Sequence, residues 1–127
     1  MPSDTRPIET HILFVGESAK TFCADFQDYP EVANGETLSS PTISVTNPSG
    51  GTLVTVSTAT VLTAAFIEYD RDGVEEDRVP SGKGVSFLAY PTSATPGSTN
   101  RGQVTVTVLV AASGGATLGK QINFVVK

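Results

Sequence analysis

The residues that most often carry enzyme chemistry are scarce in this sequence. It holds one histidine, His11, and one cysteine, Cys23, among 127 residues. A triad of nucleophile, base and orienting group would have to use His11, but its neighbours in "ETHILF" are typical of an edge strand or arm with an outward-facing histidine. Cys23 lies in "TFCADF", where a thiol usually acts as a small apolar side chain. We therefore expect no active site, no zinc site and no cofactor.

The densest charge cluster is "YDRDGVEEDR", Tyr69 to Arg78. Ca²⁺ prefers oxygen ligands, and the cluster offers carboxylates on Asp70, Asp72, Glu75, Glu76 and Asp77. Their spacing departs from that of an EF-hand loop, so calcium binding is one of two interpretations. The other is a β-hairpin with solvated charges, in which "DG" supplies the positive φ of a tight turn.

A second segment, "SGKGVSF" from Ser81 to Phe87, superficially resembles a phosphate-binding loop. Such a loop follows a buried strand and opens a helix whose N-terminus faces the anion. Here the glycines lead into another alternating β-run. We therefore expect a turn before a strand.

Composition and charge narrow the possible partners. The formal charge is −5, so the protein lacks the basic field that attracts nucleic acid or anionic lipid. Its apolar runs are interrupted by Thr and are shorter than the roughly 20 residues of a membrane helix. The N-terminus lacks the pattern of a secretion signal, and a single cysteine excludes an internal disulfide. We expect synthesis in a cytoplasm, with no nucleic acid and no membrane as partner.

Alternating apolar residues predict strands along most of the chain, separated by turns rich in Gly, Pro, Ser, Asn and Asp. Pro41 predicts an edge or a bulge, because it cannot donate to a ladder. The stretch "ATVLTAAFIEY" is compatible with a strand or a short helix, and its alternating neighbours favour the strand. The side chains expected to face inward are Phe22, Ala24 and Phe26, then Ile43 and Val45, then Val85, Phe87 and Ala89, and, in a final hairpin across "SGGA", Val104, Val106, Val108 and Val110 opposite Leu118, Ile122, Phe124 and Val126.

About seven such strands predict an all-β fold. Specifically, we expect a single immunoglobulin-like antiparallel β-sandwich over residues 13–127, preceded by a short N-terminal arm, residues 1–12. The cysteine and tryptophan landmarks of antibody domains are missing, so that likeness is architectural only. The run "ETHILFV", Glu9 to Val15, has two interpretations. It is either an arm or edge that docks on a neighbouring subunit, or the first strand of the domain's own sandwich.

Two regions are the candidate contact surfaces. The first is the Glu9–Val15 run, and the second is the long polar segment from Tyr90 to Gly102, since loops at one end of a sandwich commonly carry binding. The residues predicted to contact a partner are Ile12, Leu13, Phe14, Tyr90, Thr92, Thr95 and Arg101.

Three segments, "FCADFQDYPEVANGETLSSPTISV", "VPSGKGVSFLAY" and "GQVTVTVLVAASGGATLGKQINFVV", resemble a group of small virion proteins of tailed bacteriophages, described as fiber-tail adaptor proteins. The resemblance runs from about Phe22 to Lys127. It consists of β-sandwich motifs and supplies no catalytic residues. The N-terminal residues and the acidic segment around Arg71 to Asp77 have no clear counterpart in that group.

The resemblance implies a non-enzymatic structural component of a bacteriophage particle. Its role would be an adaptor that joins fibers or spikes to the tail or baseplate, or else a capsid decoration protein. Its partners would be other virion proteins and further copies of itself, and its location the virion after synthesis in the host cytoplasm. A different class stays open: a carbohydrate- or calcium-dependent binding module that presents the acidic segment or the Tyr90–Gly102 loop to a host glycan.

Overall fold

The described part of the chain folds mainly into β-strands. The computed structural model describes residues 9–14, 16–46, 53–69, 71–92 and 102–127. Within these ranges lie ten strands and one short helix: β1 (Glu9–Leu13), β2 (Lys20–Asp25), α1 (Pro30–Ala33), β3 (Leu38–Thr46), β4 (Val54–Val56), β5 (Thr60–Val61), β6 (Phe66–Tyr69), β7 (Glu75–Val79), β8 (Gly84–Pro91), β9 (Gly102–Ala112) and β10 (Thr117–Val126).

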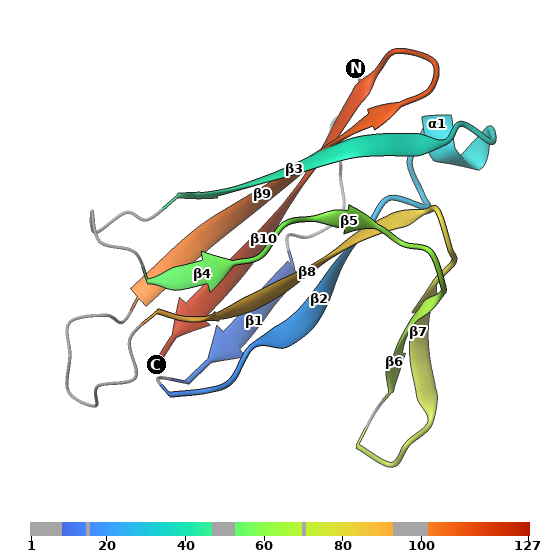
Figure 1. The fold of residues 1–127 in the computed structure, drawn as a ribbon. Helices are drawn as coiled ribbons and strands as arrows, with labels where there is room; N and C mark the ends of the chain where they lie inside the picture. Colours follow the sequence, from blue (N-terminus) through green and yellow to red (C-terminus); the bar gives the residue numbers. More distant parts are fainter. Residues whose placement is uncertain (1–8, 15, 47–52, 70, 93–101) are drawn as a thin grey trace.

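Two facing sheets form the body of the molecule (Figure 1). Sheet A has the strand order β1-β10-β9-β3, and sheet B has the order β2-β8-β4, with β5 also paired to β8. Their apolar side chains meet in one core cluster, so the predicted all-β sandwich is confirmed. Two details differ from the prediction: the described residues hold more than seven strands, and β1 runs parallel to β10. The immunoglobulin-like assignment stays a prediction.

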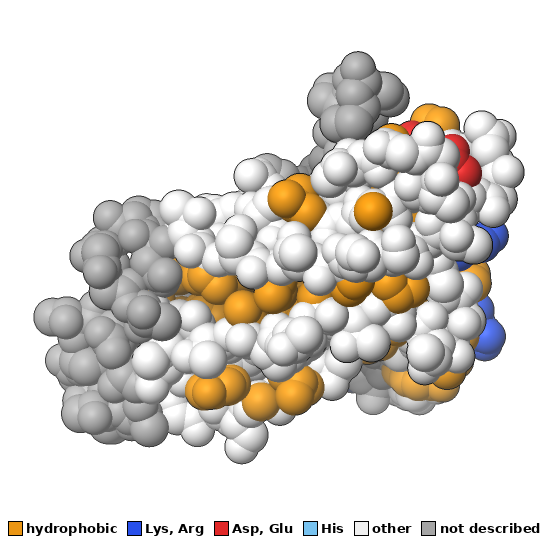
Figure 2. Space-filling model, turned by 45° about the horizontal axis from the view of Figure 1, so that its top comes forward, with side chains coloured by type: hydrophobic (Ala, Val, Ile, Leu, Met, Phe, Trp, Pro, Cys, Tyr) orange, Lys and Arg blue, Asp and Glu red, His pale blue; other side chains and the backbone are white. Residues whose placement is uncertain are grey.

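The core follows the alternation of the sequence. All the residues predicted to face inward from β8, β9 and β10 are buried, and in the β9–β10 ladder Val106 lies opposite Ile122 and Val104 opposite Phe124. On β3 the pattern weakens, because Ile43 and Val45 are only partly buried at the edge of the core. Figure 2 shows the result as a band of hydrophobic side chains along the seam between the two layers.

The first strand decides between the two interpretations of "ETHILFV", an arm that docks on a neighbouring subunit or a strand of the domain's own sandwich. Glu9–Leu13 pairs with β10 of its own chain, from Glu9 opposite Ile122 to Leu13 opposite Val126. The Leu13 carbonyl also accepts a hydrogen bond from the Lys127 amide. The run is therefore the domain's own first strand, and the predicted boundary between residues 12 and 13 falls inside it.

Pro41 marks a bulge, as its type predicted. The register of β3 against β9 shifts between Ser39 and Thr42, and β3 is an edge strand of sheet A. A bulge leaves residues out of the ladder, so the missing amide proton of Pro41 costs no ladder hydrogen bond there. Ser40 takes a left-handed conformation, φ 51°.

The stretch from Ala59 to Tyr69 contains no helix, which confirms the strand interpretation, but it is broken into β5 and β6. The chain leaves sheet B after Val61 and turns back as a separate two-stranded sheet, β6–β7. In Figure 1 this hairpin projects away from the sandwich. Its base is fixed by a second small cluster in which Cys23, Leu62 and Val79 are buried against Phe66.

Helix α1 was not predicted. It is a single turn with Pro30 at its start, where the missing amide proton costs nothing. The preceding Tyr29 ring packs on Phe26, and its hydroxyl donates a hydrogen bond to the Gly119 carbonyl. The described residues include no helix with the length and apolar character needed to cross a bilayer.

Candidate partner-binding surfaces

Of the three predicted anchors in this run, Ile12 and Leu13 lie on β1 and Phe14 follows its end. Leu13 is 1% exposed and belongs to the core, so it cannot contact a partner, and that part of the prediction is wrong. Ile12 and Phe14 are large apolar side chains that remain exposed. Leu13 is buried and its neighbour Ile12 is exposed because successive side chains along a strand point to opposite faces of the sheet.

Phe14 is held by the turn that follows β1. Its amide donates to Glu17 Oε1 at 2.6 Å, and its carbonyl accepts from the Glu17 amide at 3.0 Å. The Lys20 ammonium pairs with Glu17 Oε2. These contacts, with the Lys20 hydrogen bond as the larger cause, lower the pKa of Glu17. The exposed Phe14 ring therefore sits on a fixed backbone, which reduces the entropy that binding must overcome.

Tyr90 and Thr92 lie at the end of β8, on sheet B. The Tyr90 side chain is exposed, while the Thr92 amide donates to the Leu53 carbonyl and its hydroxyl lies 2.8 Å from that of Thr55. The other two predicted contact residues, Thr95 and Arg101, lie outside the described residues. The structure thus places Ile12 and Tyr90 near one end of the sandwich but on different sheets.

The acidic segment forms the projecting β6–β7 hairpin, as the second interpretation predicted. Gly73 has φ 80° in its turn, every residue from 71 to 78 is exposed, and Arg78 Nη2 lies 2.6 Å from Glu75 Oε1. Among the described residues, no group of three or more His, Cys, Asp or Glu side chains is arranged to hold a metal ion. Asp70 lies outside them, and calcium binding gains no support.

Charge is concentrated on this hairpin. Between residues 68 and 78 the sequence has six of its thirteen acidic and two of its eight basic residues, so this segment carries −4 of the net charge of −5. The remaining sequence is close to neutral. Tyr69 and Val74 lie among these charges and are 61% and 60% exposed. The hairpin therefore combines a net negative charge with exposed apolar side chains.

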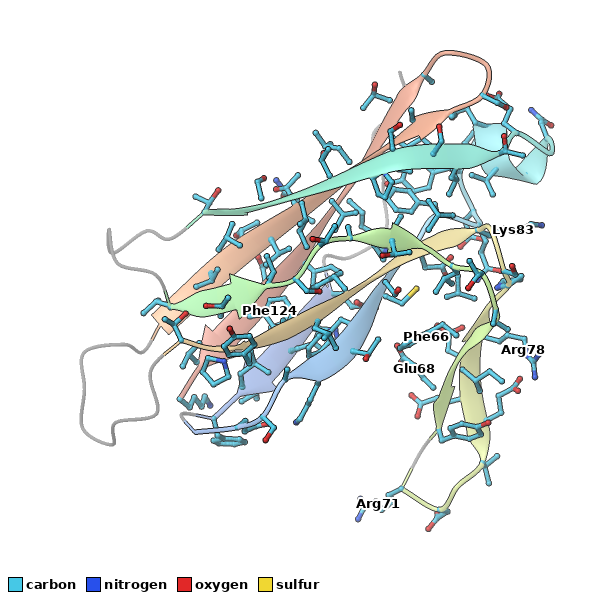
Figure 3. All side chains as sticks on the ribbon, in the orientation of Figure 1. Phe66, Glu68, Arg71, Arg78, Lys83 and Phe124 are labelled. Carbon is cyan, nitrogen blue, oxygen red and sulfur yellow. The ribbon has the colours of Figure 1, made fainter. Side chains whose placement is uncertain are left out.

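The two faces of the hairpin differ. Figure 3 shows Phe66 and Glu68 on the side toward the sandwich and Arg78 on the other side. Desolvation raises the pKa of Glu68, and the neighbouring Glu9 and Asp77 carboxylates raise it further. Ionised Glu68 thus opposes the packing of the hairpin against the body, while the apolar cluster at the base favours it.

His11 faces inward, contrary to the predicted outward orientation. Its ring centroid lies 4.8 Å from that of Phe22 and 5.7 Å from that of Phe124, and its Nε2 lies 3.1 Å from Glu9 Oε2. In the parallel pairing of β1 with β10, His11 stands opposite the buried Phe124. The ring covers the edge of an aromatic cluster, which is a packing role.

Cys23 is buried beneath the base of the hairpin. This desolvation, with smaller contributions from the Asp25 and Glu68 carboxylates, raises the pKa of its thiol to about 12. A thiol with so high a pKa is a poor nucleophile at neutral pH. Its expected role as a small apolar side chain agrees with this environment.

The structure explains why the segment "SGKGVSF" has glycine at position 84. Gly84 opens β8 opposite Asp25 of β2, and a Cβ there would lie 2.7 Å from Val79 Cγ1 and 3.0 Å from the Ala24 carbonyl oxygen. The glycine lets the hairpin base approach sheet B closely. The sequence predicted this turn but not the contact at Gly84. It also did not predict that Val74 is exposed, although an apolar residue inside a charged turn was an available signal for it.

The chain matches no protein-family model, and a search of curated proteins finds no match to it.

Proposed function

We propose that the protein is a non-enzymatic structural component of a bacteriophage particle, an adaptor that joins fibers or spikes to the tail or baseplate. The observation that carries the proposal is the concentration of charge and exposed apolar side chains on a hairpin that projects from a nearly neutral sandwich. The resemblance of the sandwich segments to fiber-tail adaptor proteins supplies the virion context. Capsid decoration is the second candidate role, because the same hairpin could dock on a shell subunit.

The hairpin has the features of a docking element for another protein. Its charges steer a partner of opposite sign and raise the association rate. Tyr69 and Val74 add apolar contact area, and aromatic anchors contribute disproportionately to binding energy. The partner that fits is a basic protein surface with a shallow apolar pocket.

An adaptor needs a second contact away from the first. The hairpin base joins sheet B where β8 begins, next to Gly84. Tyr90 lies near the other end of the same strand, and Phe14 follows β1 at that end of the sandwich. These exposed aromatic side chains are the candidate second contact.

The proposal can be tested with particles assembled without this protein. Labelled wild-type protein is added to them, in parallel with a Tyr69→Ser/Val74→Ser variant and with Leu88→Ser, which removes an exposed apolar side chain from sheet B. We expect the wild type and Leu88→Ser to bind and to restore fiber attachment, and the hairpin variant to bind at least about tenfold more weakly. Normal fibers on particles without the protein would contradict the adaptor role.

A further inference from the structure

Among the residues that the structure describes, the strands of sheet A place no charged side chain on its outer face. On β9 the even-numbered residues from 104 to 112 are buried in the core, so the odd-numbered ones from 103 to 111 face outward. The ladder register places odd positions 117–125 of β10, positions 39, 42, 44 and 46 of β3, and Thr10 and Ile12 of β1 on the same side. None of these sixteen residues is Asp, Glu, Lys, Arg or His.

The residues on this face form ordered rows across the sheet. Thr46, Thr105, Asn123 and Thr10 are consecutive partners across the four strands, and Thr105 Oγ1 donates to Asn123 Oδ1 at 2.9 Å. The next row contains Ser44, Thr107 and Gln121. Short hydroxyl and amide side chains give a face that is level and already partly hydrogen-bonded within itself.

Leu109 is the large apolar side chain at the centre of this sheet, and it lies flat. It stands opposite Gly119, where a Cβ would come within 2.9 Å of Leu109 Cδ2. The glycine therefore leaves room for the leucine side chain, which is still 41% exposed. This gives the face an apolar centre surrounded by uncharged polar groups, and the cores of protein–protein interfaces are likewise poor in charged residues.

The outer face of sheet B is smaller and obstructed. Cys23 on that side is covered by the base of the β6–β7 hairpin, and β2 ends in the charged Asp25. The hairpin and its charge thus belong to the side of the molecule away from the sheet A face. Two copies joined through sheet A would keep their hairpins apart.

We propose that this uncharged face binds the same face of a second copy, forming a two-fold dimer. In a two-fold contact, residues near the axis meet their own counterparts, so a charge there would meet a like charge. A face without charges satisfies that requirement, whereas a face that binds a different protein has no reason to exclude complementary charges. The dimer displays two β6–β7 hairpins on its outside. The inference concerns a separate surface from the hairpin and does not depend on the virion role.

The size of the face is sufficient for a weak specific dimer. Four strands of five to eleven residues, spaced about 4.8 Å apart, give roughly 500 Å² for each copy. The pair then buries about 1,000 Å², at the lower limit for a specific interface. We expect a dissociation constant in the micromolar range, since polar faces of this size seldom bind more tightly.

The test is sedimentation equilibrium of the whole chain at concentrations up to about 100 µM. The matched variants are Leu109→Lys on sheet A and Leu88→Lys on sheet B, because the two leucines lie on central strands and are 41% and 42% exposed. Thr107→Lys is a second variant on the sheet A face. Circular dichroism and thermal melting establish that each variant is folded.

We expect the wild type and Leu88→Lys to form a species of twice the 13.2 kDa chain mass. The two sheet A variants should be monomeric, with dissociation constants raised at least about 30-fold by an unpaired charge in the contact. A monomeric wild type, a trimer or larger ring, or dissociation by Leu88→Lys instead of the sheet A variants would overturn the proposal.

Discussion

Replacement of Gly84 by alanine should loosen the junction between the β6–β7 hairpin and the sandwich. The new Cβ would lie 2.7 Å from Val79 Cγ1, 3.0 Å from the Ala24 carbonyl oxygen and 3.0 Å from Cys23 Sγ. Carbon atoms pack best at about 3.5–4.0 Å, so the hairpin base must move. It cannot do so freely, because Ala24 is held in the β2–β8 ladder and Val79 is buried.

The expected cost follows from these contacts. Overfilling a packed site costs about 1–3 kcal/mol, and the lower entropy of an unfolded chain with alanine offsets about 0.4–1 kcal/mol of that. We therefore expect Gly84→Ala to lower the free energy of unfolding by about 1–2 kcal/mol, measured by urea denaturation. Because the displaced atoms cover Cys23, its reaction with a thiol reagent should also become faster.

Gly114→Ala is the control. A Cβ at Gly114 would meet the Glu36 carboxylate, with Oε1 at 2.5 Å. That carboxylate is the end of a flexible side chain and can swing away, and water then replaces its exposed hydrogen bond from the Gly114 amide. Its stability should change by less than about 0.5 kcal/mol. If Gly84→Ala is as stable as Gly114→Ala and leaves Cys23 equally protected, then close approach is not the reason for glycine at this position.

Three further predictions follow from the described contacts. Phe124→Ala should lower the free energy of unfolding by about 3–5 kcal/mol in urea denaturation, because the buried ring contacts Phe22 edge-on at 4.8 Å; a loss below about 1 kcal/mol would contradict its central place in the core. Cys23 in the native wild type should react with iodoacetamide at pH 8 about a thousandfold more slowly than in the urea-unfolded chain. The reason is that burial raises the pKa of its thiol from 9.0 to about 12. Equal rates would contradict the burial of the Cys23 thiol. Glu68→Gln should raise the free energy of unfolding at pH 7 slightly, by no more than about a few tenths of a kcal/mol for so exposed a group, measured by urea denaturation. Since the folded-state pKa of Glu68 is raised, its ionised form disfavours the fold above that pKa, and the advantage of the variant should disappear as the pH falls below the ordinary value of 4.5; an advantage that persists in acid would contradict this cause.

Most of the sandwich could be predicted because its strands have one buried and one solvated face. On β8, β9 and β10 the alternation of valine and phenylalanine with polar residues selects one register, since a slip by one residue would expose every apolar side chain. Pro41 added a second local signal through its missing amide proton. Both depend only on the residue and its immediate neighbours.

The first strand could not be assigned in the same way. Ile12, Leu13 and Phe14 are three consecutive apolar residues, so alternation does not indicate which one is buried. The answer depends on pairing with β10, more than a hundred residues further along the chain. The orientation of His11 follows from the same parallel pairing, and a lone histidine gives no sign of it.

The candidate surfaces could not be predicted from the sequence alone, because each depends on how distant segments are arranged in three dimensions. The acidic segment was visible in the sequence, but the neutrality of the sandwich around it becomes meaningful only once the segment is seen to project. The uncharged face of sheet A combines residues from four strands far apart in the chain, such as Thr10 and Asn123. The role of Gly84 depends on contact with Val79 and Ala24 across different elements.

The most direct test of the proposed virion role is the copy number of the protein in purified phage particles, measured by quantitative mass spectrometry against the tail and capsid subunits. As an adaptor, the protein should be present at a small fixed number of copies that matches the tail or fiber symmetry. A count close to that of the capsid subunits would favour decoration of the shell instead. Its absence from intact infectious particles would contradict the central claim.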